Sequence, residues 1–96
     1  MRLNEYFRRV ERTPLMPAIK CNDGFSISVQ ASERSYSTPQ DNIGPWTHVE
    51  CGYPSDKEES IIKYASDPSH PTETVYGWVP IELVEGIIKK HGGIKE

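Results

Sequence analysis

The chain has 96 residues, a formal net charge of −3 and 35% hydrophobic residues, a composition that suits one domain with a modest core. It lacks a run of about 18 apolar residues and an apolar segment behind its first methionine, so we expect no membrane span, no secretory leader and a cytoplasmic location. Cys21 and Cys51 lie far apart, without CxxC spacing or paired histidines, so we expect no metal site and no cofactor.

Charge is distributed unevenly along the chain. Residues 1–20 carry five basic and two acidic side chains, a net charge of +3, whereas residues 21–96 carry six basic and twelve acidic ones, a net charge of −6. An acidic body repels nucleic-acid phosphates, and nucleic-acid-binding proteins usually show a clustered basic face. Direct binding of DNA or RNA by the body is therefore not expected.

The N-terminal segment has two interpretations. Four apolar residues have helical spacing: Leu3, Tyr6, Phe7 and Val10. This spacing predicts a short amphipathic helix over residues 3–12. Met16 is a second candidate start of translation, and residues 1–15 would then be a basic extension in front of the domain. In either case we expect residues 16–96 to form a single α+β domain.

The stretch CNDGFSISVQAS places a turn sequence before alternating apolar and polar residues, which predicts a β-hairpin. A two-residue turn would mix polar and apolar side chains on each face of that hairpin. A three-residue loop over residues 22–24, with its glycine in the left-handed conformation, places Cys21 opposite Phe25 and Ile19 opposite Ile27. This second register gives one wholly apolar face, and we therefore predict it.

A polar loop and a second strand region follow the hairpin. Residues 32–45 show no periodicity and are rich in Ser, Pro, Asn and Gly, so we expect a long loop. Loops of this length are often functional, and this one contains Arg34 and Tyr36. Residues 46–53, WTHVECGY, alternate in the way that predicts a strand.

The C-terminal half predicts a helix, a strand and a helix. Ser55 and Glu58 have the spacing of a capping box, which predicts a helix over residues 56–66. Residues 73–80, ETVYGWVP, alternate as a strand does, and Pro80 suits the first turn of a final helix. Helical spacing predicts the inner face of that helix: Ile81, Val84, Ile87, Ile88 and His91.

These elements predict an α+β fold. We expect a small antiparallel sheet of three to four strands, beginning with the N-terminal hairpin, two helices packed on one face and an additional N-terminal helix where residues 3–12 fold. The opposite face would combine aromatic and small polar side chains: Ser26, Ser28, Gln30, Trp46, His48, Glu50, Thr74, Tyr76 and Trp78. Such a composition is typical of protein interfaces. The face is therefore a partner-binding or dimer surface, a nucleotide-stacking surface or, if the strand faces are reversed, part of the core.

We take seven residues as the candidate binding site: Arg34, Tyr36, Trp46, His48, Glu50, Tyr76 and Trp78. In a nucleotide hypothesis, a base stacks on Trp46, Tyr76 or Trp78 and Arg34 binds a phosphate. In an enzyme hypothesis, a small hydrolase uses Glu50 to orient His48 as a general base, but no nucleophile or oxyanion donor accompanies them. The two cysteines fall on apolar strand faces, which favours buried inert thiols over catalytic ones.

Most of residues 18–93 resembles a set of small proteins that bacteriophages and prophages encode. The segments that carry the resemblance are IKCNDGFSISVQAS, YSTP, GPWTHVECGYPS and TVYGWVPIELVEGIIKKHGG. The basic arm before Met16 lies outside it. We know of no established activity for these proteins, so the resemblance transfers no catalytic residue to this chain.

The resemblance implies a biological setting. Small phage accessory proteins often bind and block host defence machinery, as anti-CRISPR proteins do. We therefore expect a binding protein without enzymatic activity, which occludes a host defence complex such as CRISPR–Cas in the cytoplasm of the bacterial host. A homodimer is a further partner hypothesis, and no membrane partner is expected.

Overall fold

A computed structural model describes residues 2–11 and 13–95 and confirms the α+β class. Four antiparallel strands form one sheet in the order β1-β2-β3-β4, so strands that follow one another in sequence pair with one another. The described elements are α1 (Leu3–Arg9), β1 (Ile19–Lys20), β2 (Ser26–Gln30), β3 (His48–Gly52), the 3₁₀ helix η1 (Glu59–Tyr64), β4 (Val75–Pro80) and α2 (Ile81–Lys90).

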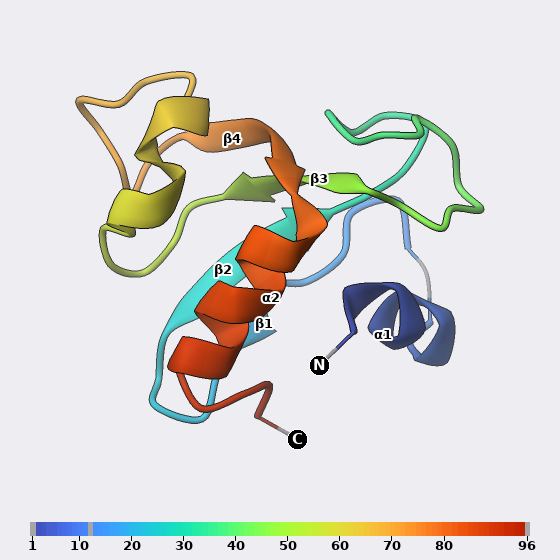
Figure 1. The fold of residues 1–96 in the computed structure, drawn as a ribbon, viewed down its shortest axis with the longest axis horizontal. Coiled ribbons are helices and arrows are strands. Elements are labelled where there is room, and N and C mark those ends of the chain that lie inside the picture. The colour runs from blue at the N-terminus through green and yellow to red at the C-terminus, as the bar shows by residue number, and fades with distance from the viewer. Residues whose placement is uncertain (1, 12, 96) are drawn as a thin grey trace.

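The helices and the sheet share one hydrophobic core. Figure 1 shows α2 crossing over the sheet, η1 next to β4, and α1 at the opposite end of the molecule from η1. The helical residues buried in the core are Leu3 and Phe7 from α1, Ile61 from η1, and Ile81, Val84, Ile87 and Ile88 from α2. The N-terminal helix therefore packs against the same core as the sheet. Among the described residues, no helix has the length and apolar character that a membrane span needs.

The N-terminal hairpin has the predicted register. Ile19 pairs with Ile27, and the N–H of Cys21 donates to the carbonyl oxygen of Phe25 at 2.8 Å. Gly24 closes the three-residue loop with a φ of +99°, which lies in the left-handed region that favours glycine. The apolar side of the hairpin is buried, so the register with one wholly apolar face is the correct one.

The Gln30 side chain and the Ser26 backbone of β2 bind segments that come from elsewhere in the chain. The side-chain amide of Gln30 accepts from the N–H of Met16 at 2.9 Å and donates to its carbonyl oxygen at 2.8 Å. At the other end of β2, the N–H of Ser26 donates to the hydroxyl oxygen of Ser55 at 2.9 Å, and the N–H of Ser55 donates to Ser26 O at 2.8 Å. At least the Gln30 side chain on the polar side of the hairpin therefore holds the fold together.

The predicted helix over residues 56–66 is wrong in its type and in its start. Because Ser55 is bonded to β2, it does not cap a helix. Glu58 takes the N-cap position instead, and its carboxylate accepts from the hydroxyl of Ser60 at 2.7 Å. The element that follows is the shorter 3₁₀ helix η1.

A β-bulge changes which residues of β4 face the core. Val49 pairs with Val79 but Cys51 pairs with Tyr76, so β4 contains one extra residue between these two pairs. As a result, Tyr76 and Val79 both point inward and are fully buried. The prediction that Tyr76 lies on the exposed face is wrong because strict alternation does not continue through the bulge.

The prediction of an exposed Trp46 is also wrong, because α1 covers this residue. Strand β3 begins only at His48, and the preceding Trp46 is 5% exposed. Asn4 of α1 accepts from the Trp46 N–H at 2.8 Å and donates to its carbonyl oxygen at 2.9 Å. The indole N–H donates to Asp41 O at 3.2 Å, and the ring meets Phe7 edge to face at 5.5 Å between centroids.

Candidate functional site

Two of the predicted aromatic residues form a pair on the surface. Tyr36 and Trp78 are 46% and 49% exposed, and their ring centroids lie 4.9 Å apart with the planes tilted by 31°. The N–H of Trp78 donates to Tyr36 O at 3.0 Å, and the N–H of Tyr36 donates to Glu50 Oε1 at 2.9 Å. We call Tyr36, Glu50, Gly77 and Trp78 the aromatic patch.

The loop that carries Tyr36 is anchored on both sides of this residue. Ser35 and Ser37 are buried, and their hydroxyls bond to the hydroxyl of Ser32 at 2.8 Å and to the carbonyl oxygen of Ser32 at 3.2 Å. A Cβ added to Gly77 would lie 3.4 Å from the Cβ of Tyr36, so the tyrosine packs directly on the glycine. The loop therefore holds Tyr36 in one place on the sheet.

Trp78 has an unusual backbone conformation for a bulky residue. Its φ is +49°, in the left-handed region, and a large non-glycine residue there is strained. Among the described non-glycine residues, only Tyr53 and Trp78 have positive φ, and both are exposed aromatics. Bulges often redirect side chains at functional sites, and the bulge in β4 directs this indole to the surface.

Gly77 is the member of the patch that the sequence interpretation missed. A glycine inside a strand sequence marks a bulge or a place where another part of the chain approaches closely. In VYGWVP both conditions hold. Gly77 lies at the bulge, and Tyr36 packs on the side of Gly77 where another residue would have its side chain. The glycine was therefore the available signal for this site.

His48 and Glu50 do not form the pair that an enzyme hypothesis requires. His48 Nδ1 is hydrogen-bonded to the hydroxyl of Thr47 at 2.9 Å, whereas Glu50 Oε1 accepts from the backbone of Tyr36. Within residues 2–11 and 13–95, no hydrogen bond joins His48 to Glu50. In this arrangement Glu50 positions the aromatic patch and does not orient the imidazole.

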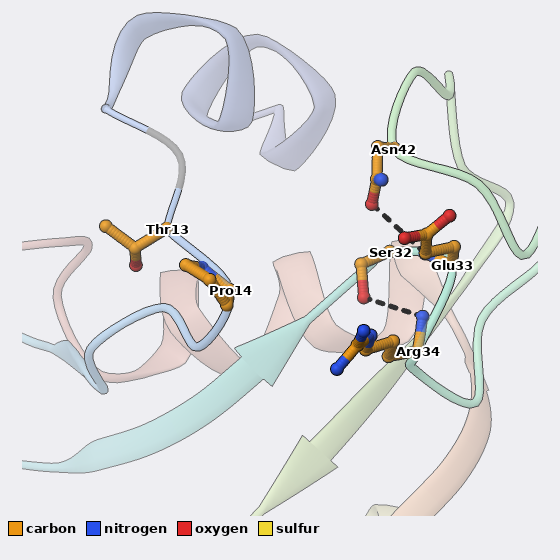
Figure 2. A pocket seen from close by; sticks show the side chains of 6 residues that line it. All are labelled: Thr13, Pro14, Ser32, Glu33, Arg34 and Asn42. Carbon is orange, nitrogen blue, oxygen red and sulfur yellow. Dashed lines mark hydrogen bonds between the residues drawn. The ribbon is translucent and has the colours of Figure 1, made fainter.

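Arg34 lines a separate hollow of about 450 Å³. Figure 2 shows the residues around it: Thr13, Pro14, Ser32, Glu33, Arg34 and Asn42. The N–H of Arg34 donates to the hydroxyl of Ser32, and the N–H of Glu33 donates to Asn42 Oδ1, both at 3.1 Å. A carboxylate shares the hollow with the guanidinium, and neither Tyr36 nor Trp78 lines it. The nucleotide hypothesis requires an aromatic ring next to Arg34, and none of the described residues that line this hollow is aromatic.

The two thiols are free and buried, as predicted. Burial raises the pKa of Cys51 strongly, and the nearby Glu50 carboxylate adds to the effect. Burial and then the charge of Asp23 raise the pKa of Cys21. Neither thiol has the electropositive, partly exposed setting of a reactive cysteine. In the part of the chain that the structure describes, no group of three or more His, Cys, Asp or Glu residues is placed to hold a metal ion.

A charged cluster joins the hairpin to the C-terminal end of α2. Glu58 is buried, and Lys90 Nζ donates to its Oε1 at 2.6 Å. His91 bonds to Asp23 Oδ2 at 2.7 Å and stacks on Phe25 with 4.0 Å between the ring centroids. The sequence placed His91 on the inner face of the last helix but did not show these partners. Because the cluster connects three segments of the chain, we interpret it as structural.

Comparisons with known protein families, with curated proteins and with solved structures find no match for this chain.

Proposed function

We propose that this protein is a binding protein that docks its aromatic patch on a basic surface of another protein and blocks that surface without chemistry. The observation that carries the proposal is the strained, half-exposed Trp78 beside Tyr36. Exposed Trp and Tyr side chains supply most of the binding energy at many interfaces. Strained residues cluster at functional sites, and the strain at Trp78 places its indole in solvent, where a partner can bind it.

The chemistry of the patch favours a cationic side chain on the partner. Two aromatic faces attract a guanidinium or ammonium group, and the Glu50 carboxylate beside them offers an ion pair. One oxygen of this carboxylate already bonds to Tyr36, which fixes its position. An arginine that reaches the patch would meet the rings and the carboxylate together.

The charge of the chain supports a basic partner. Residues 21–96 carry a net charge of −6, which steers the body towards positive surfaces. Defence complexes that hold nucleic acid expose such surfaces, for example the positively charged channel of CRISPR effectors. With the resemblance to phage proteins, this makes a host defence complex the partner class that we propose, in the cytoplasm of a bacterial host.

A phage plaque assay tests this function. Bacteria with an active CRISPR–Cas system that targets a phage would express the wild-type protein, Trp78→Ala or the control Tyr53→Ala. We expect plaques with the wild-type protein and with Tyr53→Ala, and a strong loss of plaques with Trp78→Ala. Absence of rescue by the wild-type protein in hosts carrying each of the CRISPR–Cas types would overturn the proposed target, and equal rescue by Trp78→Ala would overturn the proposed site.

The same protein can be screened for the nucleotide alternative. The rings of Tyr36 and Trp78 lie against each other with tilted planes, so a base would have to bind on an outer ring face and not between the rings. We expect no nucleotide to raise the melting temperature, since only a ligand that prefers the native state does so. A clear rise that Trp78→Ala removes would replace the protein-binding proposal with nucleotide sequestration.

A further inference from the structure

The outward face of α2 has a glycine at its centre. Glu82, Gly86 and Lys90 are exposed and spaced four residues apart, so they form one stripe along the helix. A Cβ added to Gly86 would meet nothing within 4 Å. Glycine in a helix interior is destabilising relative to alanine, so the isolated chain gains nothing from the missing side chain.

A shallow hollow of about 260 Å³ lies beside this stripe. Its lining combines an apolar part with charged residues at the edge: Glu58, Ser60, Glu82, Leu83, Gly86, Ile87 and Lys90. Lys90 is 59% exposed, and its bond to the buried Glu58 fixes the ammonium group at the rim. The face therefore offers an apolar floor, a close approach to the helix backbone and the Lys90 ammonium group, which Glu58 holds at the rim, with the exposed Glu82 further along the stripe.

The pattern of charges on α2 is self-complementary. Glu82 lies four residues before Gly86, and Lys90 lies four residues after it. If two copies of α2 pack antiparallel about a two-fold axis at Gly86, each Glu82 meets the Lys90 of the other copy. The same operation places Leu83 against the aliphatic stem of Lys89, and the antiparallel arrangement aligns the helix dipoles favourably.

We infer that a second copy of this chain binds to the face of α2 centred on Gly86 and forms a two-fold symmetric dimer. The absence of a side chain at Gly86 lets the two helix backbones approach closely, and the two Glu82–Lys90 pairs set the antiparallel direction. This surface shares no residue with the aromatic patch, so the inference stands independently of the proposed function.

The dimer should be weak and sensitive to salt. A contact made by one ten-residue helix is smaller than the interfaces of stable complexes, so we expect a dissociation constant between about 10 µM and about 1 mM. The ion pairs lie at the rim of the contact, where ions in solution screen them, so association should weaken as the salt concentration rises.

Sedimentation equilibrium of the full chain at low salt, up to about 1 mM protein, tests the dimer. Glu82→Lys should raise the dissociation constant at least about tenfold, because like charges then face each other across the axis. Gly86→Ala should also weaken the dimer while it raises the melting temperature, a combination that a folding defect does not produce. The control Glu73→Lys makes the same change in net charge in an exposed loop and should leave the dimer unchanged.

Three results would overturn the inference. The first is a wild-type protein that remains a monomer at every concentration. The second is dimerisation of Glu82→Lys and Gly86→Ala to the same extent as the wild type. The third is a Glu73→Lys variant that weakens the dimer as much as Glu82→Lys does, because net charge and not the α2 face would then control association.

Discussion

Two pairs of aromatic residues in this protein have similar chemistry and opposite surroundings. Trp46 and Tyr76 are in the core, and their polar groups bond within the chain, the indole N–H to Asp41 O and the phenol to the carbonyl oxygen of Pro71. Tyr36 and Trp78 are about half exposed. Among the described residues, no partner is found for the Tyr36 hydroxyl or the Trp78 indole N–H. The second pair therefore has polar groups available to a partner.

The cause of the difference lies in the backbone and not in the residue types. Helix α1 covers Trp46, and the bulge in β4 turns Tyr76 inward and Trp78 outward. A buried aromatic with its polar group bonded stabilises the fold, whereas an exposed aromatic in a strained conformation does not. The first pair therefore stabilises the fold, and we propose binding to a partner as the role of the second pair.

The largest expected effect comes from truncating one tryptophan of each pair. Trp46→Ala should lower the free energy of unfolding by about 3 to 5 kcal/mol, because it leaves a cavity beneath α1. Trp78→Ala should lower it by less than about 1 kcal/mol, because half of that side chain is already in water. Urea unfolding of both variants measures the two losses, and similar losses would remove the distinction between core and surface aromatics.

A smaller effect is expected at the hairpin, where positive φ is accommodated by glycine. Gly24→Val should cost about 1 to 3 kcal/mol, because a β-branched residue is strained at this φ. An added Cβ meets nothing within 4 Å, so the Cβ itself adds no clash and we expect backbone strain to be the main cause of the loss. Gly24→Asn is the matched control and should cost less, since asparagine tolerates the left-handed region. A valine variant as stable as the parent would contradict the three-residue loop.

The smallest effect distinguishes two replacements of Trp78. In an ordinary strand, alanine is more stable than glycine. At a φ of +49° the order should reverse, with Trp78→Gly more stable than Trp78→Ala by about 1 kcal/mol. Thermal and urea unfolding of the two variants give this difference directly. If alanine is the more stable replacement, Trp78 is not in the left-handed conformation and the argument from strain fails.

Local signals allowed correct prediction of the hairpin and of α2. Gly24 and the apolar alternation after it define the register, and Pro80 followed by helical spacing defines the start of the last helix. Aromatic exposure could not be predicted in the same way. Alternation does not show where β4 takes up an extra residue, although Gly77 is an indication of it. The burial of Trp46 depends on α1, a contact between residues far apart in sequence.

The sequence identified the seven candidate site residues only by type. In the structure they lie in different places. Tyr36, Glu50 and Trp78 come together in the aromatic patch, while Arg34 lines another hollow. The capping-box interpretation shows the same limit, because Ser55 has the correct spacing to Glu58 but bonds to β2 instead. Short motifs thus predict local geometry only where no distant segment competes for the same hydrogen bonds.

Quantitative capture of bacterial lysate proteins tests whether the aromatic patch binds a partner, as we propose. Wild-type protein, Trp78→Ala and Tyr53→Ala would be immobilised in equal amounts. Tyr53 is the matched control because it is also an exposed aromatic at positive φ, and it lies at the other end of β4, where its N–H donates to Thr74 O.

We expect the wild type to capture a protein that Tyr53→Ala also captures. Trp78→Ala should capture at least about tenfold less of it while remaining folded. Glu50→Gln, which keeps the acceptor for Tyr36 but loses the charge, should reduce the capture of a basic partner as well. The claim would be contradicted if Trp78→Ala captured the same proteins in the same amounts as the wild type.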